Sequence, residues 1–539
     1  MDIVENLKLK IKDALKKLGQ EVTLQDIIIE NSKDKAHGDY ATNAAMKFSR
    51  LFAKSPRDVA NLIVNNIDMT SIDKIEIAGP GFINFFMKND SLQVFVKKII
   101  DENDNYGRVD KNGLKVNVEF VSANPTGLLH VGTARGAAIG DSICRILDFA
   151  GYDVTREYYI NDAGSQITNL ALSIQARYQE LFGLEASIPE DGYAGQDIID
   201  IAKQIKEEIG DKALKMDDPV SYFKDRGMKI ELDRIIKDLD TFRVKFDVFS
   251  SEKAIRGDNA IEKEIAFLKD YVYEADSALY LKTTAFLDDK DRVIKKSNGD
   301  YTYFMPDICY HVNKMSRGYD FIIDVLGADH HGYINRMKSA LMMHGYKEDT
   351  LHVELIQMVR FLKDGVEFKA SKRRGDAITL RDVCEEVGVD AMRYFFAMRA
   401  ASTHLDFDMD LAKEQSSNNP VYYAQYAHAR LCSILEQGKD IALDIDAKEL
   451  KEPSEMSLLK HLADFSKAIN DAAKEKAPYK ITNYIHALAE LVHVFYNECR
   501  VIDRDNIAVS ASRLALVKAS QIVLRNALAL IGVSAPIHM

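Results

Sequence analysis

The sequence of 539 residues contains few cysteines and no long apolar run. Its five cysteines are odd in number, lie far apart and include no Cys-x-x-Cys pair, which argues against a disulfide framework and a structural zinc site. A membrane-spanning helix needs about 18 or more consecutive apolar residues, and no such stretch occurs. Residues 1–19 alternate charged and apolar side chains and lack the apolar centre of a signal peptide. These absences predict a cytoplasmic protein without a membrane span.

Strong compositional bias is also absent. Hydrophobic residues make up 47% and charged residues 29% of the chain, with 28 Gly, 10 Pro and no homopolymer tract. This balance excludes a disordered or fibrous protein, and the length predicts three or four domains. The net charge of −12 argues against non-specific coating of nucleic acid, because that affinity depends on Lys and Arg. A local basic groove remains compatible with this charge.

Several common catalytic motifs are missing. The sequence contains no Gly-x-Ser-x-Gly, no Walker A motif and no His-Glu-x-x-His, which disfavours serine hydrolases, P-loop NTPases and zincins. Asp329, His330 and His331 are consecutive and could be metal ligands, but no third spaced ligand accompanies them. Polar packing or a substrate pocket is therefore the favoured interpretation, and no metal site is predicted.

The chain divides by pattern into three regions. Residues 1–108 begin with an amphipathic helix and then mix helices with short strands, which predicts an α/β module. Residues 109–385 alternate strands and helices, which predicts a doubly wound parallel sheet with a charged, mostly helical insertion over about 169–300. Residues 386–539 have a helical pattern, which predicts a separate helical bundle. The expected fold class is α/β with an added module at one end and a helical domain at the other.

The segment ANPTGLLHVGTARG joins the end of a predicted strand to the start of a helix. Doubly wound sheets bind ligands at such a junction, and the free N–H groups of a helix N-terminus attract phosphate. His130 can donate to a phosphate oxygen, and Gly132 allows close backbone approach. The small residues Gly136, Ala137 and Gly140 permit tight packing of the helix. A structural turn is the alternative, because a His-x-Gly loop alone is a weak signal.

A basic cluster, FKASKRRGDAITL, follows a hairpin turn that Asp364 and Gly365 predict. Lys369 and Lys372 lie in a Gly-bounded loop that can move onto a triphosphate and offset negative charge in a transition state. A solvated basic loop is the alternative interpretation.

Two further carboxylates are candidates for a binding site. Glu119 lies in a strand that a parallel sheet would bury on both faces, so it requires a cationic partner. Tyr303 and Asp307 are four residues apart and would share one face of a helix. A helix-capping role is the alternative for Asp307.

Together, the His-x-Gly loop, the insertion, the Lys-x-Ser-Lys loop and the helical C-terminal region resemble a class I aminoacyl-tRNA synthetase. The details are similar to the arginyl-tRNA synthetase family. Its first motif resembles VEFVSANPTGLLHVGTARGAAIGD, its pocket segments resemble TYFMPDICYH and GADHHGY, and the entry to its anticodon-binding domain resembles VGVDAMRYFFAMRAASTHLDFD and NNPVYYAQYAHAR. Its N-terminal domain resembles HGDYATN and AGPGFINF. The resemblance covers nearly the whole chain, except stretches within about 169–300 and 435–480.

The resemblance implies a Rossmann-like catalytic domain and the activity of an arginine–tRNA ligase. Such an enzyme activates L-arginine with ATP and Mg²⁺, transfers it to the 3′ end of arginine tRNA, and generally needs bound tRNA for the first step. No prosthetic group and no membrane are implied, and a monomer in the cytoplasm is expected. The resemblance implies catalytic roles for His130, Gly132, Thr133, Lys369, Ser371 and Lys372. It implies ATP binding by Asn124, Pro125, Thr126, Gly127, His130, Gly132, Lys369 and Lys372. It implies arginine binding by Glu119, Ser122, Asn124, Tyr303, Asp307, Asp329 and His330.

The sequence departs from the family's two nucleotide motifs at single positions. Thr133 replaces the last His of the HIGH motif and offers one neutral hydroxyl donor in place of an imidazole. Ala370 replaces the Met of the KMSK motif, while both lysines remain.

Two rival functions are considered beside this resemblance. One is a nucleotidyltransferase of the same superfamily that acts on a small metabolite, which the long helical C-terminus disfavours. The other is an inactive tRNA-binding paralogue, which would be expected to lose His130, Lys369 or Lys372, and all three are present.

Overall fold

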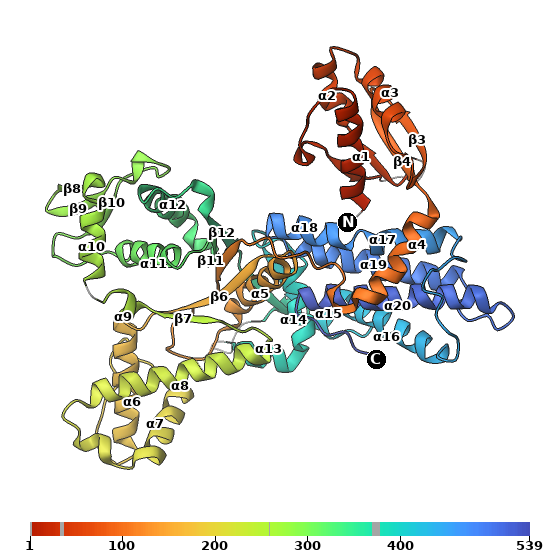
Figure 1. The fold of residues 1–539 in the computed structure, drawn as a ribbon. Coiled ribbons are helices and arrows are strands. Elements are labelled where there is room, and N and C mark those ends of the chain that lie inside the picture. The colour runs from red at the N-terminus through yellow and green to blue at the C-terminus, as the bar shows by residue number, and fades with distance from the viewer. Residues whose placement is uncertain (1–2, 33–36, 258, 369–377) are drawn as a thin grey trace.

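The computed structural model describes residues 3–32, 37–257, 259–368 and 378–539. They form an N-terminal module, a central parallel sheet, two smaller bodies attached to that sheet and a C-terminal helical bundle (Figure 1). Lys369, Ser371 and Lys372, which the sequence predicts to be catalytic, lie outside the described residues.

The N-terminal module combines an antiparallel sheet with three helices. Its sheet has the strand order β1-β2-β4-β3. The elements are α1 (Ile3–Lys17), β1 (Ile29–Asn31), β2 (Tyr40–Thr42), α2 (Ala44–Phe52), α3 (Pro56–Asn66), β3 (Ile72–Ala78) and β4 (Phe82–Met87). Helix α1 buries Leu7, Ile11 and Leu15 along one face, as its amphipathic pattern predicts.

The next helix, α4 (Asn89–Glu102), leaves the module. It packs against α17 (Pro453–Ala463) and α20 (Ile507–Leu530) of the C-terminal bundle. The end of residues 1–108 therefore packs against the C-terminal bundle.

The central sheet has five parallel strands in the order β12-β11-β5-β6-β7. Its strands are β5 (Lys115–Glu119), β6 (Asp153–Ile160), β7 (Val248–Ser251), β11 (Phe321–Gly327) and β12 (Leu351–Ile356). Helices cover both faces, because Ile323 of β11 joins the core around α5 (Ala134–Phe149) while Ile322 joins the core around α11 (Phe304–Ser316) and α12 (Ile334–Met343). The predicted doubly wound fold is confirmed. The strand order reverses between β5 and β11, where such sheets bind ligands.

Helix α5 crosses the sheet at a glycine. A Cβ atom at Gly140 would overlap the ring of Phe120, so close packing requires glycine there, as the sequence predicts. Gly136 differs from that prediction, because the nearest atom to a Cβ at this position is Cγ1 of Ile356 at 4.0 Å.

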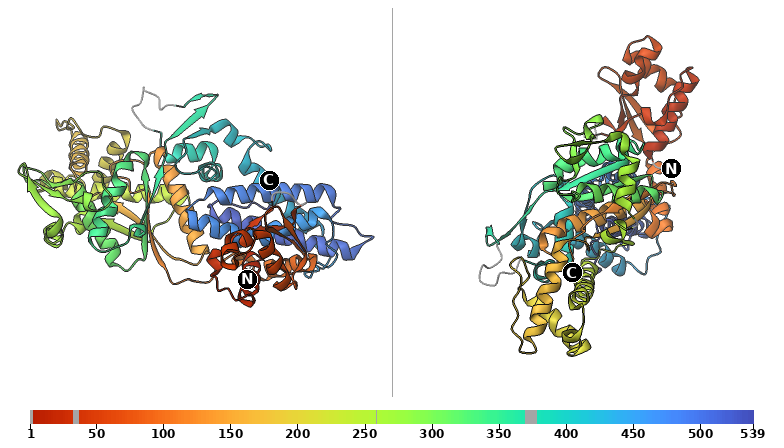
Figure 2. Two further views of the ribbon diagram at one scale, coloured as in Figure 1. Left: turned by 90° about the horizontal axis from the view of Figure 1, so that it is seen from above. Right: turned by 90° about the vertical axis from the view of Figure 1, so that its left-hand side faces the viewer.

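The region around residues 169–300 differs from the expected single helical insertion. Helices α6 (Ser165–Glu180), α7 (Gln196–Ile209) and α8 (Pro219–Thr241) form one body with its own apolar core. The chain then adds β7 to the central sheet before it forms the second body. That body contains α9 (Glu252–Ile255), α10 (Ala260–Phe267), β8 (Val272–Ala275), β9 (Ala278–Leu281) and β10 (Arg292–Lys295). Each strand is only four residues long, too short for a clear alternation of apolar and polar side chains in the sequence. The α6–α8 body and the N-terminal module project at opposite ends of the molecule (Figure 2).

A hairpin and a helical bundle complete the chain. Strands β13 (Val359–Lys363) and β14 (Val366–Glu367) are joined by Asp364 and Gly365, both with positive φ, which confirms the predicted turn. Strand β15 (Leu405–Asp408) pairs with β13. The remaining helices are α13 (Leu380–Val387), α14 (Val389–Ala397), α15 (Met409–Lys413), α16 (Pro420–Gln437), α18 (Phe465–Glu475) and α19 (Tyr479–Glu498).

Helix α20 is long and apolar enough to cross a membrane, but 72% of an apolar 18-residue stretch within it is buried inside the protein. It serves as the core helix of the bundle, in contact with α16 and α19.

The two glycines of α5 provide a matched test of packing. We expect Gly140→Ala to lower the free energy of unfolding by about 1 to 3 kcal/mol, because the added methyl overlaps Phe120. We expect Gly136→Ala to raise it by roughly 0.5 to 1 kcal/mol, because alanine favours the helix and the site has room. Urea unfolding of both variants measures the difference, and equal effects would contradict the packing argument.

Candidate functional site

The chain turns sharply where β5 ends. Val121 and Ser122 have positive φ values of 70° and 41°, and the Ser122 N–H donates to the Phe120 carbonyl at 3.0 Å. This conformation is costly for a β-branched residue, and such strain is concentrated at functional sites. The turn places Ser122 Oγ where it donates to Glu119 Oε1 at 2.9 Å and accepts from the Tyr159 N–H at 3.1 Å.

His130 lies exposed in a turn that precedes α5. Its Nδ1 accepts a hydrogen bond from the Gly132 N–H at 2.9 Å, which leaves the proton of a neutral ring on Nε2. Partial burial also lowers the pKa of His130, which favours this neutral form. A Cβ at Gly132 would lie 2.9 Å from Nδ1, so glycine is required for the contact. The arrangement presents one Nε2–H donor toward solvent at the start of a helix.

Backbone hydrogen bonds tie the His130 turn to the chain that follows the predicted lysine loop. The Val131 N–H donates to the Ile378 carbonyl at 3.0 Å, and the Leu380 N–H donates to the Leu129 carbonyl at 2.8 Å. Residues 378–380, the first that the structure describes after the predicted lysine loop, therefore lie beside His130.

The preceding loop, residues 124–127, contacts the α6–α8 body. The Asn124 side-chain amide donates to Gln166 at 2.7 Å, and a Cβ at Gly127 would lie 3.7 Å from a carboxylate oxygen of Asp197. Pro125 is buried, and the Thr126 N–H donates to the Asn124 carbonyl at 2.8 Å. Thr133 precedes the first residue of α5, and its side chain makes no capping hydrogen bond.

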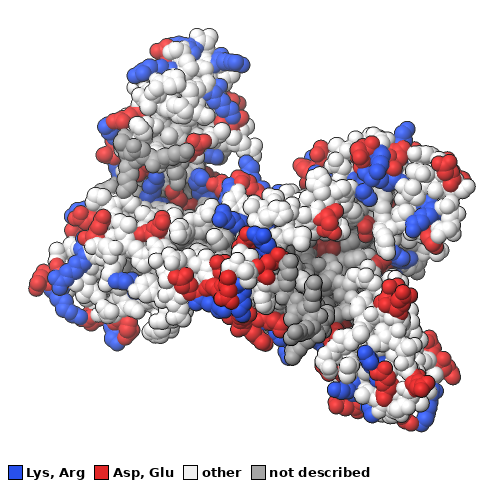
Figure 3. All heavy atoms as spheres, turned by 180° about the vertical axis from the view of Figure 1, so that it is seen from behind, with Lys and Arg blue, Asp and Glu red and all other residues white. Residues whose placement is uncertain are grey.

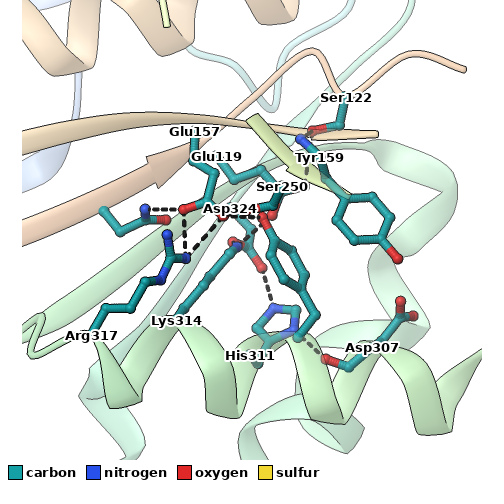
Figure 4. Close-up of polar contacts among 12 residues, drawn as sticks. Glu119, Ser122, Glu157, Tyr159, Ser250, Asp307, His311, Lys314, Arg317 and Asp324 are labelled. Carbon is teal, nitrogen blue, oxygen red and sulfur yellow. Dashed lines mark hydrogen bonds and ion pairs between the residues drawn. The ribbon is translucent and has the colours of Figure 1, made fainter. Parts of the chain in front are cut away.

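Helix α11 covers the carboxyl ends of β5 and β11 with polar side chains (Figure 4). Lys314 is fully buried and forms ion pairs with Asp324 at 2.8 Å and with Glu119. Burial alone would lower the pKa of Lys314, but the two carboxylates raise it above its usual value. The predicted need of Glu119 for a cationic partner is confirmed.

Asp307 lies one helical turn before His311 on α11. Burial raises its pKa to about 7. The nearby carboxylates Glu119 and Glu252 contribute to the increase, whereas the charge of His311 and a hydrogen bond from Tyr333 oppose it. Among the residues that the structure describes, no Lys or Arg forms an ion pair with Asp307. A carboxylate in this environment favours the binding of a cationic ligand.

The other predicted pocket residues lie in more open positions. Tyr303 precedes the first residue of α11 and is 83% exposed, so its ring does not lie against Asp307 as expected from the spacing. The tyrosine that contacts Asp307 is Tyr333. The side chains of Asp329 and His330 are 84% and 52% exposed and lie 3.7 Å apart.

Sequence reasoning missed the buried groups behind the pocket. Glu157 on β6 accepts hydrogen bonds from four side chains, one of which, Arg317, also forms an ion pair with it at 2.7 Å. The missed residues are Asn117, Glu157, Ser250, Tyr310, His311, Lys314, Arg317 and Asp324. Two signals were available: polar residues inside apolar strands, and the spacing of cations along 311–317.

The C-terminal helical bundle has a cavity of its own. A cavity of about 820 Å³ lies between the ends of α16 and α19 and the C-terminus. Tyr426, Arg430, Tyr496 and Met539 line part of it, and the Arg430 guanidinium lies 3.7 Å from the Tyr496 ring centroid. Tyr422 and Tyr426 stack beside it with ring centroids 6.1 Å apart. Such aromatic and guanidinium surfaces suit unstacked nucleobases.

The parallel sheet, the His130 turn at its switch point and the match to a family model define a class I aminoacyl-tRNA synthetase. Residues 95–431 match the family model of the class I (R) tRNA synthetase catalytic domain. Residues 5–87 match the arginyl tRNA synthetase N terminal domain, and residues 424–539 match the DALR anticodon binding domain. The chain belongs to the arginyl-tRNA synthetase family.

Relatives agree with this assignment over the whole length. The chain is 50% identical to the arginine–tRNA ligase of Bacillus subtilis and 51% identical to that of Anoxybacillus flavithermus, with complete coverage of both chains in each comparison. The solved arginyl-tRNA synthetase of Thermus thermophilus is similar in fold, with a TM-score of 0.79, 22% identity and complete coverage of both chains.

The environment of Asp307 predicts a pH-dependent gain in stability on its removal. Since the pKa rises from 3.8 to about 7 on folding, the folded state loses stability as the pH rises through this interval. We expect Asp307→Asn to stabilise the ligand-free protein by about 2 to 4 kcal/mol at pH 8 and by little at pH 4. Urea unfolding of the catalytic region at both pH values measures this, and an equal gain at both would contradict it.

Proposed function

We propose that the pocket between β5, β11 and α11 selects L-arginine and that the His130 turn holds the phosphates of ATP. The chain then forms arginyl-adenylate and transfers the arginyl group to the 3′ end of arginine tRNA. The observation that carries this proposal is Asp307, a carboxylate in a pocket that supplies it with no ion-pair partner among the described residues. A guanidinium remains charged at any relevant pH and fits a carboxylate in two-point geometry.

Within the pocket, we assign the two cationic groups of arginine to two carboxylates. Asp307 would bind the guanidinium, and Glu119 would face the α-ammonium group together with Ser122 and Asn124. Glu119 already binds Ser122 and Lys314, so the substrate would share its oxygens. Tyr303, Asp329 and His330 would contribute from the exposed rim.

The reaction needs no protein nucleophile. A carboxylate oxygen of arginine attacks the α-phosphorus of ATP, and the bond to the bridging oxygen breaks to release pyrophosphate. A terminal ribose hydroxyl of the tRNA then attacks the arginyl carbonyl carbon, and AMP leaves. ATP would enter as its Mg²⁺ complex on residues 124–127, His130 and Gly132.

Charge stabilisation would provide most of the catalysis. The His130 Nε2–H would donate to a phosphate oxygen, helped by the N-terminus of α5. We propose that Lys369, Ser371 and Lys372 act on the leaving pyrophosphate and that Thr133 adds one neutral hydrogen bond.

We further propose that residues 1–108 and 386–539 contact the tRNA on either side of the catalytic region, residues 109–385. The cavity beside Arg430 and Tyr496 would take unstacked anticodon bases. On the face shown in Figure 3, Lys and Arg are interspersed with Asp and Glu, so tRNA contacts there would be local. The protein would act as a monomer in the cytoplasm, which its free cysteines suit.

Pyrophosphate exchange with each amino acid, with and without tRNA, tests the proposal as a whole. We expect label to enter ATP only with arginine and only when arginine tRNA is present. Exchange with another amino acid, or with a small metabolite in place of it, would refute the assignment.

Substrate selection tests Asp307 directly. Asp307→Asn preserves volume but places the arginine head against a neutral amide, at a cost of several kcal/mol by the usual penalty for an unpaired buried charge. We expect kcat/KM for arginine to fall and its ratio to kcat/KM for citrulline, the neutral isostere, to collapse. If the ratio is unchanged in the variant, the specificity carboxylate lies elsewhere, and Asp329 is the next candidate.

The two donors of the phosphate motif should differ in importance. We expect His130→Ala to raise the activation barrier by about 3 kcal/mol and Thr133→Ala by roughly 1 kcal/mol, because the second residue offers one neutral hydroxyl. Single-turnover adenylate formation compares them. Equal losses would reveal a role for Thr133 beyond hydrogen bonding.

A further inference from the structure

Three carboxylates lie side by side in the central sheet. Strand register places Asp324 of β11 beside Glu119 of β5, and Glu119 beside Glu157 of β6. All three are at most 7% exposed. Because neighbouring strands are about 4.8 Å apart, three adjacent charges would repel strongly unless cations lie against them.

Helix α11 and Arg317, the residue directly after its last one, supply these cations at intervals of three residues (Figure 4). The ion pairs are His311 with Asp324 at 2.7 Å, Lys314 with Asp324 at 2.8 Å and with Glu119, and Arg317 with Glu157 at 2.7 Å. The three cations therefore follow the row of carboxylates from β11 through β5 to β6, and Lys314 contacts two of these carboxylates.

The contacts continue beyond the row along α11 to the backbone of Asp307. The carbonyl of Asp307 accepts from His311 Nδ1 at 2.7 Å, and Asp324 accepts from Nε2 at 2.7 Å. Since both partners are acceptors, both ring nitrogens carry protons and His311 is a cation. An unbroken chain of contacts thus runs from Asp307 through His311, Asp324 and Lys314 to Glu119.

We infer that Lys314 is a positioning residue for arginine: it fixes the Glu119 carboxylate toward the substrate's ammonium group. The inference rests on the proposed role of Glu119. Lys314 is fully buried, so it acts through Glu119 and has no access to the substrate. Its contact with Oε2 leaves Oε1 on Ser122, which orients the carboxylate at both oxygens. A purely structural lysine would affect folding without affecting the recognition of one substrate.

A double-mutant cycle separates these roles. The variants are Glu119→Gln, Lys314→Met and the combination, assayed for KM of arginine and of ATP in tRNA-dependent pyrophosphate exchange. We expect each single variant to raise the arginine KM by about tenfold or more, with the ATP KM changed by less than about twofold. In the Glu119→Gln background, Lys314→Met should add less than about twofold, because its effect passes through Glu119.

Arg317→Gln is the matched control. It removes the same kind of ion pair from the same helix, one turn beyond Lys314, so it should lower stability while leaving the arginine KM within about twofold of the parent. If Lys314→Met does not fold, Lys314→Met with Asp324→Asn removes the cation and one of its anions together, and the cycle is run in that background.

The possible outcomes separate the inference from the proposed function. Multiplicative effects of the two single variants, or a normal arginine KM in Lys314→Met, would overturn the positioning role while Glu119 kept its own. A normal arginine KM in Glu119→Gln would instead overturn the proposed role of Glu119.

Discussion

Charge neutralisation across β11, β5 and β6 is the constraint on which the catalytic region depends. A parallel sheet covered on both faces offers no water to these strands, so Asp324, Glu119 and Glu157 are stable only with the cations of α11 above them. This requirement fixes the rotation of α11 about its axis. The position of Asp307, which lies on the same helix, therefore follows from the packing of buried charges.

The site also keeps two opposite electrostatic tasks apart. In the proposed assignment, the carboxylates on the α11 side would bind the two cationic groups of arginine, whereas they would repel ATP, a polyanion. The strained turn at Val121 and Ser122 carries the chain from one environment to the other within a few residues. Beyond it, the His130 turn offers neutral N–H donors at a helix N-terminus, with a histidine whose own geometry keeps it uncharged. Backbone strain at this turn is therefore associated with the change in polarity between the carboxylates beside α11 and the N–H donors of the His130 turn.

Local features of the fold could be predicted from the sequence, whereas partners across the sheet could not. The Asp364–Gly365 turn and the α1 face depend on neighbouring residues only, and both follow from pattern. That Glu119 needs a cation follows from burial, but that the cation is Lys314 depends on a residue 195 positions away. Tyr303 was misplaced because helical spacing does not show where a helix begins. The inserted strands were missed because segments of four residues are too short to show the alternation of a strand.

The packing of α4 on the C-terminal bundle has a consequence for synthesis of the chain. Leu92, Phe95, Val96 and Ile99 of α4 are buried, and part of their cover is α20, which leaves the ribosome about 400 residues later. At roughly 5 to 20 residues per second, this apolar face waits on the order of 20 to 80 s for its partner. During that interval the nascent protein carries an uncovered hydrophobic stripe beside a module that can already be folded. Such an exposed apolar face favours aggregation or the binding of a chaperone until the C-terminal bundle has packed on α4.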